Sequence, residues 1–422
     1  TMYMDKVVHC DNTTQLRCGH HKKITKILEV FIMAGGPGSY VFGAEEKKEL
    51  MDVIDAGALF RYGTPGVDGF QGKVATFEKE IAEQLGHKYV VATSSGTGSL
   101  MCCLAALGIG MGDEVIVPGY TFIASISTIA MMNAVPVLAE IDDSLTIDPT
   151  KIEALITPRT KAIVPVHMLG NPCKMDQIME IAKKHNLKVI EDCAQCIGGK
   201  YRDTMVGLVG DVGCYSFCQS KHFTTGGEGG MVVTNNEDIG WECRSFRDHG
   251  YDVKTRMNML ALEEKLPYIH NRVGFNYRMS NVVAAIGLAQ TEKADEYKAM
   301  RMHNNELYRR CLADVPGIRF QTILPQAECV SWMNTIVLDP ALYGHTKDEL
   351  IAYLRENNVD SRLLFNGMHR QKSLLDFGCD CSGEYPICDM LTENGFYLPS
   401  ASSLNEDTIC AICQLIKDFA QQ

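Results

Sequence analysis

The chain of 422 residues has a hydrophobic fraction of 46%, a charged fraction of 22% and a formal net charge of −12. This length favours two domains over one simple core, and the composition is that of a soluble globular protein. The negative charge argues against nucleic acid or an anionic membrane as a partner, and no apolar run reaches the ~18 residues of a membrane span.

The N-terminal 40 residues are expected to form a disordered leader ahead of the fold. Their short apolar stretch resembles a signal peptide only weakly, because Lys26 and Glu29 interrupt it. The first helix is expected directly after the leader, at AEEKKELMDVIDAG (44–57).

From about Lys88 onward, short runs rich in valine and isoleucine alternate with amphipathic helical stretches. The expected strands are KYVVATS (88–94), DEVIVP (113–118), VPVLAEI (135–141), TKAIVPVH (160–167) and LKVIEDC (187–193). The helical stretches between them are 96–110, 121–134, 148–156 and 174–186. This alternation is typical of an α/β fold, in which helices cover both faces of a mostly parallel sheet.

The alternation fades after GGMVVTNN (229–236), and a long helical region at 281–313 is expected to lead out of the large domain. The remaining runs WMNTIVLD, TKDELIAYLRENN and EDTICAICQLIKDFA indicate a smaller α+β domain. We therefore expect a large domain at 41–295 and a small C-terminal domain at 296–422.

The 17 cysteines are scattered, and many lie inside apolar runs, where a free thiol behaves as a small hydrophobic side chain. That pattern suits a reducing cytoplasm better than a disulfide framework. The cluster CDCSGEYPIC (Cys379, Cys381, Cys388) lacks a second pair and a nearby histidine at zinc spacing. We expect no metal site.

Polar or aromatic residues follow five of the predicted strands. They are Ser94 to Thr97, Thr121 with Phe122, His167, Asp192 with Gln195, and Ser216 with Lys221. Ligands in open α/β sheets bind at the carboxyl ends of the strands, so these side chains are expected to converge on one rim.

The stretch SSGTGSL carries a strand into a helix. The free N–H groups at the helix start, with the hydroxyls of Ser95 and Thr97, would form a phosphate cradle. The alternative is an ordinary helix cap. No GxGxxG follows a strand and no GxxxxGK[ST] occurs, so neither a dinucleotide nor a triphosphate is indicated.

Asp192 ends a buried strand, where a carboxylate is costly unless a cation faces it. It is either a helix N-cap or an aspartate that keeps a ring nitrogen protonated. Lys221, in SFCQSKHFTTGGEGG, is either a surface charge or a reactive amine beside a glycine-rich loop. A lysine, a phosphate cradle, an aspartate and an aromatic such as Phe122 are the set that pyridoxal phosphate requires.

Four longer motifs occur in the same order as in a known family. They are IEDCAQ, YSFCQSKHFTTGGEGGMVVTNN, RDHGY and VGFNYRMSNVVAAIGLAQ. With them the chain, from about Glu45 to its end, resembles the DegT/DnrJ/StrS family of pyridoxal-phosphate-dependent sugar aminotransferases. The resemblance implies the fold-type-I aminotransferase architecture and a homodimer with active sites at the subunit interface.

The resemblance also implies roles for individual residues. Lys221 matches the Schiff-base lysine, Asp192 the partner of the pyridinium, and Gln195 the residue beside the phenolic oxygen. Relatives with histidine in place of the lysine are dehydratases, so Lys221 favours transamination. The remaining matches are Phe122 stacked on the ring, Gly96, Thr97 and Ser216 at the phosphate, and Asn276 reaching the phosphate from the partner subunit.

The substrate residues depart from many relatives that use nucleotide-linked sugars. The early loop LFRYGTPG contains Arg61 and Tyr62, and LLFNGMHRQ adds His369 and Arg370. An arginine suits a carboxylate through a bidentate pair. LFRYG resembles the subgroup that aminates C8 of 8-oxo-3-deoxy-manno-octulosonate, an acidic free sugar. The alternative is a structural pair between Arg61 and an acid such as Asp68.

The sequence thus predicts a cytoplasmic aminotransferase that moves nitrogen from glutamate to a keto or aldehyde sugar, with octulosonate, a precursor of lipopolysaccharide, as the first candidate. Three alternatives stay open at this point. They are an aminotransferase for a nucleotide-linked 4-keto-6-deoxy sugar, a sugar dehydratase, and a regulatory protein that binds pyridoxal phosphate without turnover.

Overall fold

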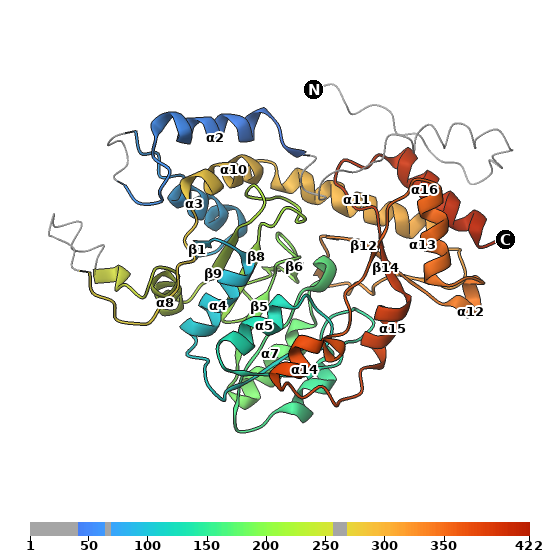
Figure 1. Ribbon diagram of the computed structural model, residues 1–422, viewed down its shortest axis with the longest axis horizontal. Coiled ribbons are helices and arrows are strands. Elements are labelled where there is room, and N and C mark those ends of the chain that lie inside the picture. Colours follow the sequence, from blue (N-terminus) through green and yellow to red (C-terminus); the bar gives the residue numbers. More distant parts are fainter. Residues whose placement is uncertain (1–40, 64–68, 256–267) are drawn as a thin grey trace.

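The computed structural model describes residues 41–63, 69–255 and 268–422 (Figure 1). The predicted leader at 1–40 and Asp68 lie outside the described residues. Within the described part of the chain, no helix combines the length and the apolar character needed to cross a membrane.

A seven-stranded sheet with the order β1-β9-β8-β5-β4-β2-β3 forms the centre of the molecule. Its strands are β1 (Tyr89–Thr93), β2 (Glu114–Pro118), β3 (Val135–Ala139), β4 (Thr160–Ile163), β5 (Lys188–Asp192), β8 (Val212–Ser216) and β9 (Gly230–Thr234). Only β9 runs antiparallel to its neighbours β1 and β8. The other neighbours are parallel, which confirms the predicted mixed, mostly parallel sheet.

Helices cover both faces of this sheet (Figure 1). One face packs against α4 (Gly96–Ala106), α5 (Ala124–Met131) and α8 (Glu237–Arg247). The other packs against α3 (Lys73–Leu85), α7 (Met175–His185) and α10 (Asn281–Thr291), with α2 (Ala44–Ala56) lying on α10. Short connections contain α6 (Pro149–Ile152), η2 (Glu153–Leu155), η3 (Met168–Gly170) and the hairpin of β6 (Lys200–Tyr201) and β7 (Thr204–Met205).

Helix α7 shows how the sequence specifies these elements. Met175, Ile178 and Ala182 recur at helical spacing and are fully or almost fully buried, while lysines occupy the outer face. The helix ends where Asn186 takes a left-handed conformation with φ 53°, which asparagine adopts more readily than most residues.

The predicted helical region at 281–313 is two helices, α10 and α11 (Ala294–Leu312), separated at Glu292 and Lys293. Helix α11 leads to an antiparallel sheet with the order β10-β12-β14-β13. Its strands are β10 (Ile318–Arg319), β12 (Asn334–Leu338), β13 (Arg362–Leu363) and β14 (Gly395–Leu398). Nearby lie α12 (Pro340–Tyr343), α13 (Lys347–Glu356) and α16 (Glu406–Phe419), while β11 (Ala327–Glu328) pairs with β6.

The C-terminal region contributes to two hydrophobic cores. Helices α11, α13 and α16 enclose one of them with β12 and β14. The segment with η4 (Met368–Arg370), α14 (Lys372–Phe377) and α15 (Pro386–Asn394) packs instead into the core of the seven-stranded sheet. The Ile387 N–H, for example, donates to the Glu140 carboxylate at 2.9 Å. The division of the chain at residue 295 stays a prediction.

A buried carboxylate, Glu78 on α3, joins three parts of the large sheet's surroundings. Arg61 from the loop after α2 and Arg244 and Arg247 from α8 all lie within 3.4 Å of it. Burial opposes ionisation of Glu78, but Arg244, Arg61 and Arg247 outweigh it and lower the pKa to about 2. One carboxylate therefore balances three guanidinium groups.

We predict that Glu78→Gln lowers the free energy of unfolding by about 3 kcal/mol, because it leaves buried guanidinium groups uncompensated. The exposed Glu83→Gln on the same helix is the control, with a change within about 0.5 kcal/mol. Because the pKa of Glu78 is lower in the folded protein than its unfolded value of about 4.3, the ionised carboxylate stabilises the protein at pH values above about 4.3. The wild type should therefore lose this contribution as pH falls from about 4.5 toward 2, and Glu78→Gln should not. Urea unfolding at several pH values measures both effects, and equal pH dependence of the two proteins would contradict the assignment.

Candidate active site

Asp192 lies at the carboxyl end of β5, near the middle of the sheet, and is 4% exposed. Its Oδ2 accepts a hydrogen bond from the Ser125 hydroxyl at 2.7 Å, and its Oδ1 accepts one from the Ala194 N–H at 3.1 Å. Both donors are neutral. They fix the orientation of the carboxylate without forming an ion pair with it, and the Lys221 amine lies close enough to interact with its charge. A cationic ligand group would be favoured beside this buried carboxylate.

Lys221 follows the neighbouring strand β8 and is itself buried. Burial lowers the pKa of its amine to about 8, although Cys218 and Asp192 favour the charged form. The Nζ atom lies 4.1 Å from the ring centre of Trp332. A lysine with this pKa exchanges its proton near neutral pH, which an ordinary surface lysine does not.

The glycine-rich loop after Lys221 returns the chain to the sheet. Gly227 has φ 125°, which side-chain-bearing residues rarely adopt. A Cβ atom at Gly230 would lie 2.2 Å from the Ser95 carbonyl oxygen, so only glycine permits this approach of β9 to the start of α4. The glycines thus bring the Lys221 loop to the end of β1.

The phosphate cradle is predicted at the start of α4. The Ser95 hydroxyl accepts a hydrogen bond from the Gly98 N–H at 3.0 Å, so this side chain is an N-cap, as the plainer interpretation held. Gly96 and Thr97 occupy the first helical positions, whose N–H groups have no partner within the helix. Ser216 lies directly beside Gly96, since a Cβ atom there would approach the Ser216 Cβ to 2.8 Å. These groups suit a phosphate.

Gln195 and Phe122 border the same region of the sheet. The Gln195 Oε1 accepts the Leu169 N–H at 2.7 Å, which leaves the amide NH2 as a donor for a ligand oxygen. Phe122 follows β2, is 51% exposed and has its ring 5.5 Å from that of Phe365. An exposed aromatic face at the strand ends is available for stacking on a planar ring.

Asn276 is exposed, and its side-chain oxygen accepts a hydrogen bond from the Arg278 Nε at 3.1 Å. The segment that carries it runs beside the end of β1, where the Ser94 N–H donates to the Tyr277 carbonyl at 2.8 Å. That Asn276 contacts the phosphate bound by a partner subunit stays a prediction.

The predicted substrate residues already have partners within the chain. Arg61 pairs with Glu78, and the Tyr62 hydroxyl donates to Asp248. His369 lies 2.8 Å from Asp389 on α15, and Arg370 lies 2.9 Å from Glu393 on the same helix. The structural interpretation of Arg61 is thus supported, with Glu78 in place of Asp68 as the acid.

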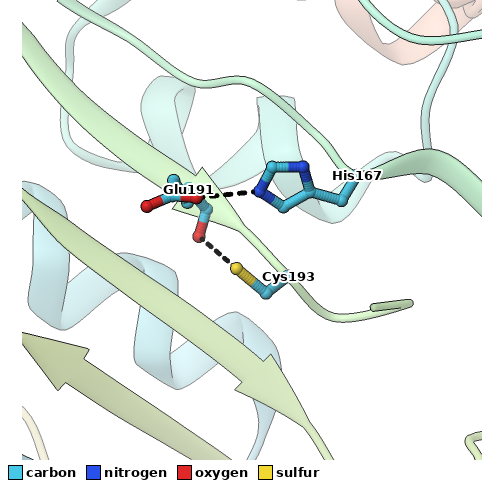
Figure 2. Close-up of side chains that lie close together, drawn as sticks. All are labelled: His167, Glu191 and Cys193. Atoms are coloured by element: carbon cyan, nitrogen blue, oxygen red, sulfur yellow. Dashed lines mark hydrogen bonds and ion pairs between the residues drawn. The ribbon is translucent and has the colours of Figure 1, made fainter. Parts of the chain in front are cut away.

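His167, which was expected at the rim of the strand ends, points toward Glu191 (Figure 2) and is fully buried. Its Nε2 lies 3.0 Å from the Glu191 carboxylate, and its Nδ1 accepts the Cys173 N–H at 3.0 Å. The Nε2 therefore carries the proton and donates to Glu191, which also accepts the Gly210 N–H at 2.6 Å. Cys193 lies close enough to complete a three-ligand cluster. Because the histidine and glutamate atoms are engaged in these hydrogen bonds, the cluster serves as a support for the end of β5.

The sequence interpretation missed Trp332 and Glu78. Trp332 is one of only two tryptophans and directly precedes a strand, which is a weak signal. Its contact with Lys221 spans more than a hundred positions and has no local sequence pattern. Glu78 looks like any glutamate of an amphipathic helix until the three arginines are brought to it.

Comparison with known proteins identifies the family. The DegT/DnrJ/EryC1/StrS aminotransferase family matches residues 43–417. GDP-perosamine synthase from Caulobacter vibrioides is 39% identical over 338 residues, covering 80% of this chain and 87% of that protein. UDP-N-acetyl-3-dehydro-α-D-glucosamine 3-aminotransferase from Acidithiobacillus ferrooxidans is 35% identical, with 83% and 88% covered.

The X-ray structure of an aminotransferase from Psychrobacter cryohalolentis has a TM-score of 0.82 and 30% identity, covering 91% of this chain and 98% of that one. The fold, the arrangement around Lys221 and these similarities agree. The chain belongs to the DegT/DnrJ/EryC1/StrS aminotransferase family and is a sugar aminotransferase that depends on pyridoxal phosphate.

Proposed function

We propose that the protein transfers an amino group from glutamate to a keto group of a nucleotide-linked sugar. The observation that supports the aminotransferase chemistry is the buried Lys221 amine, with its pKa of about 8, near the buried carboxylate of Asp192. Two relatives whose names specify GDP- and UDP-linked sugars support the nucleotide. The reaction would take place in the cytoplasm.

The charges of the described residues do not favour the acidic octulosonate over a nucleotide-linked sugar. Arg61, His369 and Arg370, the cations expected to bind its carboxylate, are paired with Glu78, Asp389 and Glu393 respectively. A substrate carboxylate would have to displace an internal acid in each case, which removes the electrostatic gain.

The residues present fit the cofactor. When bound, pyridoxal phosphate supplies a carbonyl that condenses with amines and a ring that withdraws electrons. The first N–H groups of α4 and the Ser216 hydroxyl would bind the phosphate. Asp192, held by Ser125 and Ala194, would keep the ring nitrogen protonated, and the Gln195 amide would donate to the phenolic oxygen.

Lys221 would move the proton that transamination requires. An amine with a pKa of about 8 is present in both protonation states near neutral pH. It can therefore accept a proton from the donor's Cα as a general base and deliver it to the cofactor as a general acid. The surrounding burial keeps water from competing for that proton.

We predict that Lys221→Ala abolishes turnover and leaves the cofactor without a covalent link to the chain, whereas Lys161→Ala, an exposed lysine on β4, retains both. The measurement is borohydride reduction of the loaded protein followed by peptide mapping, together with steady-state rates. A label on any other lysine would overturn the assignment of Lys221.

We predict that kcat/KM for a nucleotide-linked 4-keto-6-deoxy sugar exceeds that for 8-oxo-3-deoxy-manno-octulosonate by roughly a hundredfold or more. Two similar proteins are named for GDP- and UDP-linked sugars, and the cations expected to bind the octulosonate carboxylate are already paired. Products are read by mass after incubation of each acceptor with glutamate. Comparable rates, or a preference for the octulosonate that Arg61→Ala removes, would restore the acidic-sugar interpretation. Product that has lost water without gaining nitrogen would indicate a dehydratase.

We further propose a homodimer with shared sites, in which Asn276 serves the partner's phosphate cradle. Mixing Lys221→Ala chains with Asn276→Asp chains, each inactive alone, should then restore one intact site per mixed dimer. The expected recovery approaches a quarter of wild-type activity after random exchange, since half the dimers are mixed and each has one site. Mixed dimers that form but stay inactive would contradict a shared site.

A further inference from the structure

Trp332 is the aromatic residue in contact with Lys221, and its position is fixed at three points. Its Nε1 donates to the Ser220 carbonyl at 2.7 Å, directly before Lys221 in the chain. Its backbone N–H donates to the Leu169 carbonyl at 2.9 Å. Its carbonyl accepts a hydrogen bond from the Arg301 Nη1 at 2.6 Å. The indole is 5% exposed, so these contacts hold it inside the protein.

The backbone around Trp332 adopts uncommon conformations that support this placement. Ser331 has φ 51° and Leu169 has φ 62°, both in the left-handed region. Such conformations are costly for residues with side chains and persist where the surrounding structure requires them. Leu169 also donates its N–H to Gln195, so the two predicted cofactor residues Gln195 and Lys221 are connected through the Leu169–Trp332 contact.

Arg301 adds to the support. It is 1% exposed, and burial lowers the pKa of its guanidinium to about 10. In the parts of the chain that the structure describes, no carboxylate lies within ion-pair distance of it. Its hydrogen bonds go to the Trp332 carbonyl and the Ser402 hydroxyl. Because the donor is charged and buried, its hydrogen bond to the Trp332 carbonyl is stronger than one from a neutral group and restrains the backbone there.

We propose that Trp332 is a positioning residue for Lys221, whose indole face binds the ε-ammonium group whenever the amine is not bonded to the cofactor. The distance of 4.1 Å from Nζ to the ring centre is well inside the range of cation–π attraction. The ring favours the charged form of the amine, against the effect of burial. It thereby holds the amine at one place and limits how far its pKa falls. This role in catalysis rests on the function proposed above for Lys221, but the contact itself is testable without the cofactor.

Other groups around the amine bear on its charge. Asp192 on β5, Cys214 on β8, and Cys218 and Glu228 on the adjoining loops favour the ammonium form. His222 is neutral, since burial, with Arg301, lowers its pKa to about 3. The carboxylates act on the amine in every Trp332 variant, so a change on removing the indole isolates the contribution of the ring.

The test measures the pKa of Lys221 in the full-length chain freed of cofactor by a hydroxylamine wash. Acetylation of Lys221 is followed by mass over a pH series in competition with a free amine. Trp332→Leu should lower the pKa by about 1, and Trp332→Phe, which keeps a weaker aromatic face, should lower it by less. Trp241→Leu removes the other tryptophan and should leave it unchanged. Circular dichroism checks that each variant is folded.

The outcomes are distinct. The proposal is supported if the pKa of Lys221 is lowest in Trp332→Leu, intermediate in Trp332→Phe and highest in the wild type. If Trp332→Leu does not fold, a small fall in the pKa of Lys221 in Trp332→Phe supports the proposal alone. An unchanged or raised pKa, or equal falls in both variants, overturns it, because water entry or lost packing would act without regard to the ring. Since no turnover is measured, a failure of Lys221 as the cofactor lysine would appear only in the borohydride experiment.

Discussion

Burial of a single amine is the constraint on which the site depends. Lys221 has its usual basicity only in water, and the fold encloses it between the ends of two central strands and the indole of Trp332. That enclosure is possible because the glycine-rich loop lets β9 approach the first turn of α4 closely. The phosphate cradle, the Asp192 carboxylate and the lysine are thus products of one packing arrangement.

The charged residues around the candidate site differ in whether they have a partner of opposite charge within the chain. Arg61, His369 and Arg370, the cations predicted to bind an anionic substrate, are already paired with the internal acids Glu78, Asp389 and Glu393. Asp192 differs from these acids, because its hydrogen bonds come from the neutral groups of Ser125 and Ala194 and the cation near it is the Lys221 amine. A buried carboxylate is costly, and the protonated ring of the bound cofactor would reduce that cost. The buried carboxylate without an arginine or histidine partner therefore lies in the candidate active site.

Much of this site was predictable from the sequence because its signals are local. The motifs around Asp192, Lys221 and Gly96 each sit at a strand end, and the sheet brings those ends together. The two helices at 281–312, the buried position of His167 and the partner of Arg61 were not predictable in this way. The burial of His167 and the partner of Arg61 depend on residues distant in sequence, Glu191 and Glu78 respectively. The role of Trp332 was hidden for the same reason, since Ser220 lies 112 positions before it.

The route of the chain between its two hydrophobic cores has a consequence for cooperativity. After entering the core around β12, the chain returns at Leu364 to the core of the large sheet, where Tyr385 and Leu391 pack, and then crosses again into β14. The small core therefore cannot be completed unless the large one is already present. The two halves of the protein should melt together as one calorimetric unit, and the small one should not be separable as an independently folded fragment.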